Sequence, residues 1–218
     1  MNEEERIAHT LDALTPMRAR GSEVLVVDGG STDATVIRAQ SGADIVLSAP
    51  RGRAAQMNAG AGHARGDVLL FLHADTRLPA DADVLVLDAL AATGRMWGRF
   101  DVSIEGQHPL LPIVAAAMNL RSRWTGIATG DQAIFVKRVL FDQIGGYPGI
   151  ALMEDIALTA ALRKLSAPLC ISRKAITSGR RWEKHGLLRT ILLMWRLRLA
   201  YSLGADPNEL ALRYAARK

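Results

Sequence analysis

The sequence predicts an α/β fold in which helices flank a mainly parallel sheet. Short apolar runs of strand length alternate with segments that carry apolar residues at helical spacing. Strands separated by helices of this length pair in parallel through right-handed crossovers. The 218 residues suffice for one domain with its own core, and 49% hydrophobic with 22% charged residues is typical of a globular protein. Disorder as the default state is excluded.

The first half of the chain supplies most of the alternation. Ile7, Leu11 and Leu14 predict a helix from Glu4 to Arg20, which Gly21 ends. Strands are then expected at 24–27, 44–47 and 68–72, and helices at 33–40, 53–63 and 83–92.

The second half continues the pattern. We expect a strand at 97–104, an apolar helix at 110–123, a strand at 133–136, a turn at 145–148 and a helix that begins near Glu154. The segment 187–203 is apolar on nearly every side, apart from three arginines. It predicts a helix that packs on several faces or lies at a membrane interface, and it is too basic to span a membrane.

Charge and cysteine content narrow the setting. The single cysteine, Cys170, excludes an intrachain disulfide, and the chain opens on charged residues rather than a signal-peptide core. We expect a cytoplasmic protein. The net charge is +5, and residues 173–198 contain one acid, Glu183, among many basic residues. This asymmetry predicts an anionic partner, such as nucleotide phosphates, nucleic acid or an anionic membrane surface.

The first motif with chemical potential follows the first apolar strand. Asp28 ends that strand and enters the turn of Gly29 and Gly30, where a ligand can approach the backbone closely. The Asp28 carboxylate could accept a hydrogen bond from the ring N–H of a uracil-like base, while Ser31, Thr32 or Asp33 caps the next helix. A strand-turn-helix cap without any ligand also explains this motif.

A second motif follows the strand at 68–72. His73 and Asp75 are two residues apart, so in a strand they face the same side. A carboxylate at that edge suits Mg²⁺ or Mn²⁺, which would neutralise charge on a departing nucleoside diphosphate. An ordinary turn residue is the alternative for Asp75.

Two further motifs lie in the second half. Glu154 and Asp155 open a helix, where acids serve as capping residues or, in the catalytic interpretation, as a general base for an acceptor hydroxyl. Arg180 and Arg181, followed by Trp182, lie after a predicted strand. Their planar side chains match phosphate oxygens in a segment that could close over a diphosphate, although a solvated loop explains them too.

Taken in order, these motifs resemble the family-two inverting glycosyltransferases of the glycosyltransferase-A fold, whose sheet is of the Rossmann-like nucleotide-diphospho-sugar transferase type. The similarity covers nearly the whole chain. It is closest to a bacterial subgroup with Leu-His-Ala-Asp-Thr and Met-Glu-Asp motifs. The segments that carry it are 2–4, 27–33, 52–60, 72–76, 130–132 and 153–155.

The resemblance implies a role for each motif residue. The nucleotide and donor would be bound by Asp28, Gly29, Ser31, Arg53 and Asn58, with Arg180 and Arg181 over the diphosphate. Asp75, with His73 beside it, would hold Mg²⁺ or Mn²⁺. Asp155 would be the base with Glu154 beside it, and Asp131 and Gln132 would shape the acceptor and sugar site. The chain would then divide into a nucleotide-binding half (1–95), an acceptor and catalytic half (96–182) and basic C-terminal helices (183–218).

The sequence departs from the family in two places. His73 stands where the family usually has an aspartate, which leaves one carboxylate in that triplet. The family's first strand precedes the Asn-Glu-Glu run, but here Met1 directly precedes Asn2. We expect that the natural product starts upstream, or that this chain is an incomplete version with impaired folding or donor binding, because the missing strand would leave buried backbone groups unpaired.

The function expected is transfer of a sugar from a nucleoside-diphosphate sugar, with UDP favoured, to an acceptor hydroxyl with inversion. The alternatives are a catalytically impaired module that binds a nucleotide sugar or an anionic membrane, and a sugar-phosphate nucleotidyltransferase, whose usual glycine-rich basic loop does not precede Asp28. The partners expected are a nucleotide sugar, an acceptor glycan, lipid or small molecule, an anionic membrane surface on the inner face of the cell membrane, and a second copy in a homodimer. Nucleic acid is not expected, because leucines interrupt the basic segment and it has no recognition motif.

Overall fold

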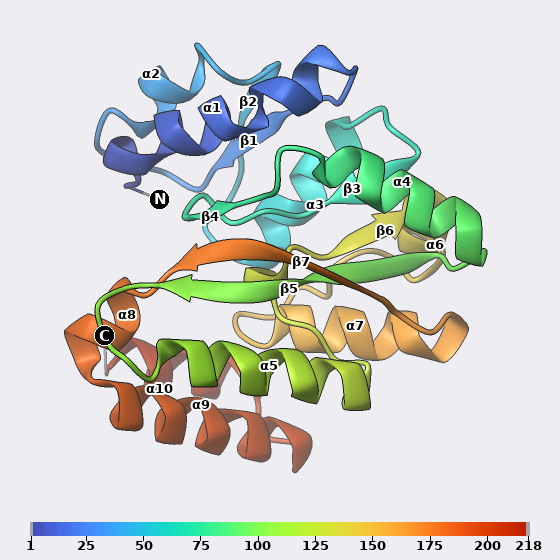
Figure 1. Cartoon of the computed structure of the whole chain (residues 1–218). Helices are drawn as coiled ribbons and strands as arrows, with labels where there is room; N and C mark the ends of the chain where they lie inside the picture. Colours follow the sequence, from blue (N-terminus) through green and yellow to red (C-terminus); the bar gives the residue numbers. More distant parts are fainter. Residues whose placement is uncertain (1, 217–218) are drawn as a thin grey trace.

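The computed structural model describes residues 2–216, without the side chains of Arg181 and His185, and contains two sheets (Figure 1). The smaller sheet pairs β1 (Leu25–Asp28) with β2 (Ile45–Ser48) in parallel. Two helices, α1 (Glu4–Ala19) and α2 (Thr35–Ala39), pack on it through buried residues that include Ile7 and Leu11. A third, α3 (Arg53–His63), follows β2 and lies so close to β1 that a Cβ on Gly60 would be 3.2 Å from Val27.

The larger sheet has the order β3-β6-β5-β7-β4. Its strands are β3 (Val68–Leu70), β4 (Thr76–Arg77), β5 (Trp97–Glu105), β6 (Phe135–Lys137) and β7 (Leu169–Ser178). The parallel pairing that we predicted is present between β1 and β2 and between β5 and β7. The other three pairs are antiparallel, because β6 runs against both β3 and β5, and β4 runs against β7. The α/β class is therefore confirmed, with a mixed rather than mainly parallel larger sheet.

Helices cover both faces of the larger sheet. They are α4 (Ala82–Thr93), α5 (Leu111–Thr125), α6 (Arg138–Gln143), α7 (Glu154–Leu165), α8 (Arg180–His185), α9 (Leu187–Ser202) and α10 (Pro207–Ala215). On one face, Val86 and Leu90 of α4 are buried with Phe100 and Phe135 of the sheet. On the other, α5 and α9 share a core with β5, and the figure draws these two helices side by side. The sheet is thus the middle layer of three.

The C-terminal helices brace the loop in front of α7. Leu197 of α9 and Leu210 of α10 are buried together with Met153, the residue that precedes α7. Arg180 and Trp182, which we expected in a flexible loop, belong to the short helix α8. Among the described helices, none is long and apolar enough to cross a membrane.

A large cavity separates the two sheets. It is lined by residues of β1 and of β3, and each of these strands is paired on one side only. Its volume, about 2090 Å³, exceeds the ~300–1,000 Å³ of an ordinary small-molecule site. The cavity continues to the start of α7 and to α5 and α9, so one connected space runs from residues of the N-terminal half of the chain to the C-terminal helices.

Candidate active site

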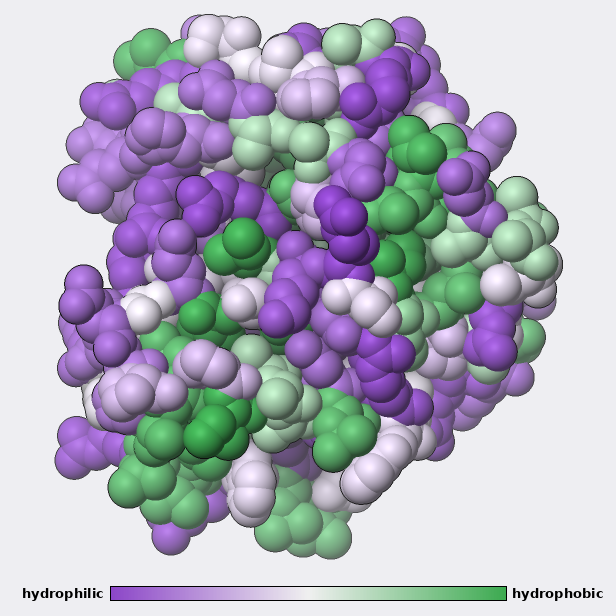
Figure 2. Space-filling model, in the orientation of Figure 1, coloured by the Kyte–Doolittle hydropathy of each residue, from purple (hydrophilic) through white to green (hydrophobic). Residues whose placement is uncertain are grey.

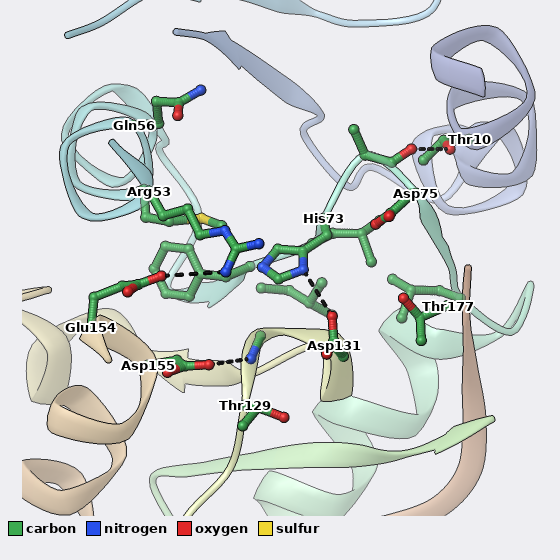
Figure 3. A pocket seen from close by; sticks show the side chains of 18 of the residues that line it. Thr10, Arg53, Gln56, His73, Asp75, Thr129, Asp131, Glu154, Asp155 and Thr177 are labelled. Carbon is green, nitrogen blue, oxygen red and sulfur yellow. Dashed lines mark hydrogen bonds and ion pairs between the residues drawn. The ribbon is translucent and has the colours of Figure 1, made fainter. Parts of the chain in front are cut away.

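Charged side chains from both halves of the chain meet in this cavity (Figure 3). Seven of the residues predicted from the sequence line it, namely Arg53, His73, Asp75, Asp131, Glu154, Asp155 and Arg180. They come from the starts of α3, α7 and α8, the loop after β3 and the 3-10 turn η1 (Gly130–Gln132). Residues that are far apart in the sequence are therefore gathered into one site.

Asp155 is held by backbone N–H groups at the start of α7. The N–H of Gly130 donates to its Oδ2 at 3.0 Å, and the N–H of Ile156 donates to its Oδ1 at 2.7 Å. Met153, two residues earlier, has φ of 70° in the left-handed region, which is costly for a residue with a side chain. Packing of Met153 against α9 and α10 holds this conformation. The carboxylate is thus fixed, and it faces the cavity.

Glu154 is a buried acid beside Asp155. Its side chain is only 6% exposed, and its Oε1 lies 3.7 Å from Nη1 of Arg53. Burial raises the pKa of Glu154, and the negative charge of Asp155 raises it further, against the opposing effect of Arg53. Burial acts to lower the pKa of Arg53, but Glu154, Asp131 and Asp155 outweigh it and the pKa is raised. Arg53 therefore remains a cation whose half-exposed side chain faces a group of acids.

His73 and Asp131 form a second contact across the cavity. The distance from His73 Nδ1 to Asp131 Oδ1 is 3.3 Å, and the imidazole is 14% exposed. Gly130 lies against the same ring, since a Cβ built there would be 2.3 Å from Nε2. A side chain at position 130 would displace the imidazole, so the glycine lets η1 approach His73.

Figure 3 draws Asp75 on the opposite side of His73 from Arg53, and the His73 ring points toward Asp131 rather than toward Asp75. The Asp75 carboxylate lines the cavity and takes part in none of the side-chain hydrogen bonds or ion pairs seen among the described residues. Within residues 2–216 as described, no three His, Cys, Asp or Glu side chains are grouped to hold a metal. A lone available carboxylate fits a divalent cation that takes its remaining ligands from phosphate oxygens and water, and does not fit a closed protein cage.

Asp28 is bonded into its own turn. Its Oδ2 accepts hydrogen bonds of 2.8 Å from the N–H groups of Gly30 and Ser31, and its Oδ1 accepts one of 2.5 Å from the Ser31 hydroxyl. Burial acts to raise the pKa of Asp28, but the hydrogen bonds from Ser31 and Gly30 lower it. Asp28, Gly29 and Ser31 lie beside the cavity lining rather than in it. The turn thus accounts for the hydrogen bonds of Asp28, and its role toward a nucleobase stays a prediction.

Two predicted site residues make backbone contacts instead of facing the cavity. The Asn58 amide donates to the carbonyl oxygen of Tyr147 at 2.8 Å and accepts from its N–H at 2.9 Å, which fastens α3 to the turn at 145–148. Gln132 is fully buried, and its Oε1 accepts from the N–H of Thr129 at 3.3 Å. A sequence does not distinguish an amide that binds a ligand from one that bonds to the backbone.

Arg180 is bonded to the N-terminal Asn-Glu-Glu run. Its Nη2 donates to Oε2 of Glu3 at 2.8 Å, so α8 is tied to the residue that precedes α1. The predicted role of Arg181 concerns a side chain that lies outside the described residues. Of Arg180 and Arg181, which we expected over a diphosphate, the structure thus describes the side chain of Arg180, which lines the cavity and is bonded to the Glu3 carboxylate.

Sequence reasoning missed two arginines in the cavity wall. Arg121 of α5 and Arg198 of α9 both line it, and two nitrogen atoms of Arg121 and one of Arg198 are buried without a hydrogen-bond partner in the described structure. Arg198 was noted only as an interruption of an apolar helix. The signal that could have found them is an arginine within an apolar helical pattern. The same pattern also predicts an arginine on a solvated face of the helix.

Known proteins match this chain in sequence and in fold. A family model described as Glycosyl transferase family 2 matches residues 1–145. Two curated relatives from Mycobacterium tuberculosis, of strains CDC 1551 / Oshkosh and ATCC 25618 / H37Rv, are each named an uncharacterized glycosyltransferase. Both are 33% identical over 175 residues, which is 74% of this chain and 66% of each relative.

Solved structures share the fold at lower identity. The mannosyltransferase PcManGT from Pyrobaculum calidifontis, in complex with GDP-Man and Mn²⁺, is 22% identical with a TM-score of 0.65 over 99% of this chain and 67% of its own. Glucosyl-3-phosphoglycerate synthase from Mycobacterium tuberculosis, in complex with Mn²⁺, uridine diphosphate and glucosyl-3-phosphoglycerate, is 19% identical with a TM-score of 0.68 over 94% and 78%. Because the family model covers more than half of the sequence, the chain belongs to glycosyl transferase family 2.

Proposed function

We propose that this protein transfers a sugar from a nucleoside-diphosphate sugar to an acceptor hydroxyl, with inversion at the anomeric carbon. The observation that carries the proposal is Asp155, a carboxylate fixed by the Gly130 N–H and facing a cavity that also contains Arg53, Asp75 and Arg180. A positioned base and cations for a diphosphate are what a direct displacement requires. Family membership supports the reaction class.

In the proposed reaction, the acceptor hydroxyl lies beside Asp155. Its oxygen attacks the anomeric carbon while the carboxylate accepts its proton, and the bond from that carbon to the diphosphate oxygen breaks with both electrons going to the diphosphate. Attack from the face opposite the leaving group inverts the configuration, and no bond forms between sugar and enzyme. Because both Asp155 oxygens accept N–H hydrogen bonds, the carboxylate is held in place for the incoming proton.

The leaving group meets the positive charge of Arg53 and Arg180 at the edge of the cavity. Arginine forms paired hydrogen bonds with phosphate oxygens. Asp75 would hold Mg²⁺ or Mn²⁺, which neutralises charge on a diphosphate when bound. The solved relatives contain Mn²⁺ with GDP-Man or with uridine diphosphate, so both nucleotides are candidates, with a UDP-sugar as our first choice.

A donor panel tests the proposal. UDP- and GDP-sugars are scored by thermal shift with and without Mn²⁺, and stabilising donors are then assayed for product whose anomeric configuration is read by NMR. We expect at least one nucleotide sugar to raise Tm, more so with Mn²⁺, and Asp75→Ala to lose the Mn²⁺-dependent part. A chain that binds no nucleotide sugar and forms no product would contradict the proposal.

We also propose that α9 attaches the protein to an anionic membrane surface. Along one face of α9 and just beyond it, large apolar side chains are 57–79% exposed, namely Leu188, Leu192, Trp195, Leu199 and Leu203. Arg189 and Arg196 are exposed beside them. Figure 2 shows hydrophobic side chains gathered in the region where Figure 1 draws α5 and α9. An apolar stripe with flanking arginines is typical of helices that lie in an anionic lipid interface.

Co-sedimentation with vesicles tests the attachment. The wild type is expected to sediment with phosphatidylglycerol vesicles at low salt and less with phosphatidylcholine. Replacing Leu188, Leu192 and Leu199 together by Gln should abolish the effect, whereas Ile37→Gln, a side chain that is 72% exposed on α2, should not. Failure of the wild type to sediment at low salt would end this part of the proposal.

A further inference from the structure

Arg121 is a partly buried cation, and two of its nitrogen atoms are buried without a hydrogen-bond partner among the described residues. These atoms are Nε and Nη2, and the residue projects from α5. A guanidinium stays charged in proteins, and a buried charge without hydrogen bonds is costly. Because Arg121 also lines the cavity, a ligand with acceptor oxygens would remove that cost.

The surroundings of Arg121 place it at the catalytic carboxylates. Burial lowers the pKa of Arg121, while the charges of Asp155 and Asp131 act in the opposite direction. Asp155 does not hydrogen-bond to the Nε or Nη2 of Arg121, and the N–H groups bonded to its oxygens are those of Gly130 and Ile156. Arg99, the neighbouring buried arginine, is bonded instead to Ser122, Asp101 and Asn119. Arg99 therefore has protein partners, whereas the Nε and Nη2 of Arg121 remain available to a ligand.

Arg198 provides a second such cation. It lies on α9, lines the same cavity, and has a buried Nε with no partner among the described residues. The wall of the cavity on these two helices is otherwise largely apolar, with Met118 and Ala117 from α5 and Ile191 and Met194 from α9. A carboxylate or phosphate that contacted both arginines would find paired N–H groups that match its oxygens, in an apolar wall where little water competes.

The position of this site assigns it to the acceptor. Asp155 must receive the proton of the acceptor hydroxyl, and Arg121 is the cation coupled to Asp155 from the side of α5 and α9. The donor half of the cavity has its own cations in Arg53 and Arg180. We propose that the acceptor carries an oxyanion group, a carboxylate or a phosphate, and that Arg121 and Arg198 bind this group while its hydroxyl reaches Asp155. The inference rests on the proposed glycosyl transfer.

Matched small hydroxy compounds test the inference. Glycerol, glycerate and glycerol 3-phosphate are offered as acceptors and as ligands in thermal shift, and phosphatidylglycerol vesicles offer the same phosphate on a lipid. The wild type is expected to bind or glycosylate the anionic compounds in preference to glycerol. Arg121→Gln should weaken this binding tenfold or more, raising the acceptor KM with little change in the donor KM. Arg123→Gln, two residues along α5, is the matched control and should behave as wild type.

The outcomes separate the inference from the function on which it rests. The acceptor site would be overturned by any of three results: equal use of glycerol and the anions, no binding of any oxyanion to the wild type, or unchanged binding in Arg121→Gln. If the wild type still binds a donor and forms product, the proposed glycosyl transfer stands even then. If Arg121→Gln does not fold, Arg121→Lys is tested instead, because lysine keeps the charge but loses the paired N–H groups. We then expect weaker acceptor binding at an unchanged donor KM. Acceptor binding at the wild-type level would overturn the site. Glycosylation of the soluble anions identifies the acceptor as a small molecule, whereas glycosylation of the vesicles alone identifies it as a lipid.

Discussion

The backbone N–H of Gly130 and the carboxylate of Asp155 are joined by a hydrogen bond of 3.0 Å, which ties the turn η1 to the start of α7. The same glycine contacts the His73 ring on its other side, and that ring contacts Asp131. A single residue without a side chain therefore positions the proposed base and the histidine relative to each other.

Asp155→Asn is expected to abolish transfer while donor binding persists. The amide keeps the size of the side chain but no longer accepts a proton from a hydroxyl, and loss of a general base typically costs about 10²- to 10⁴-fold in rate. Product formation and thermal shift with the donor measure the two effects separately. Asp88→Asn, at an exposed position of α4, is the control and should leave both unchanged. Turnover at the wild-type rate in Asp155→Asn would remove Asp155 from the mechanism.

Gly130→Ala is expected to destabilise the protein and impair activity. The new Cβ would lie 2.3 Å from His73 Nε2, so the ring must move away from Asp131, and overpacking of this kind costs ~1–3 kcal/mol. Urea unfolding measures the change. Gly62→Ala is the matched control, since nothing lies within 4 Å of its Cβ and alanine favours helix α3 by up to ~1 kcal/mol. Equal free energies of unfolding for the two variants would show that the His73 ring moves without loss of stability.

How much the sequence reveals differs from element to element. The bounds of α3 were predicted as Arg53–His63, with Gly66 ending the helical pattern, and the structure has the same bounds. The antiparallel direction of β6 was not predicted, since a strand pattern in the sequence does not show which neighbours the strand pairs with. Residues 180–182 were expected in a segment that closes over a diphosphate, whereas they lie in helix α8, where Arg180 contacts Glu3, 177 residues away.

The residues of the candidate site were likewise predicted only in part. Asp75, Glu154 and Asp155 were found because strand and helix ends predict them, and Asp131 because the family resemblance implies it; all four line the cavity. Asn58 and Gln132 were expected to face ligands, and they bond to protein groups instead. Arg121 was missed, because only the packing of α5 shows that its nitrogens are buried.

Glu154→Gln is expected to raise Tm more at pH 8 than at pH 5. Burial, with the charge of Asp155, raises the pKa of Glu154 above its unfolded value of 4.5, and Arg53 and His73 only partly oppose this. The contribution of Glu154 to stability is therefore fully present below pH 4.5 and is lost as pH rises through the folded pKa. Gln carries no charge and removes the loss. Glu209→Gln, whose side chain is 64% exposed on α10, should show no such trend, and a pH-independent gain for Glu154→Gln would contradict the assignment.

An extended apolar segment supplied ahead of Met1 is expected to stabilise the protein. β1 and β3 line opposite parts of the cavity, and each is paired on one side only. The N–H of Asn2 donates to the Ser31 hydroxyl at 3.0 Å, so a strand that leads into Asn2 would end beside the end of β1 and run parallel to it. Such a strand would pair backbone groups and cover apolar lining such as Val26 and Leu70.

Fusion of about ten residues tests this expectation. A segment of alternating Val and Thr should raise Tm and nucleotide affinity, whereas a Gly-Ser segment of equal length should change neither, because it has little tendency to form a strand. If the two fusions melt at the same temperature and bind nucleotide equally, the space between β1 and β3 is not a strand position. In that case the cavity is part of the native ligand site, and bulky substitutions at Val26 or Leu70 should weaken donor binding instead.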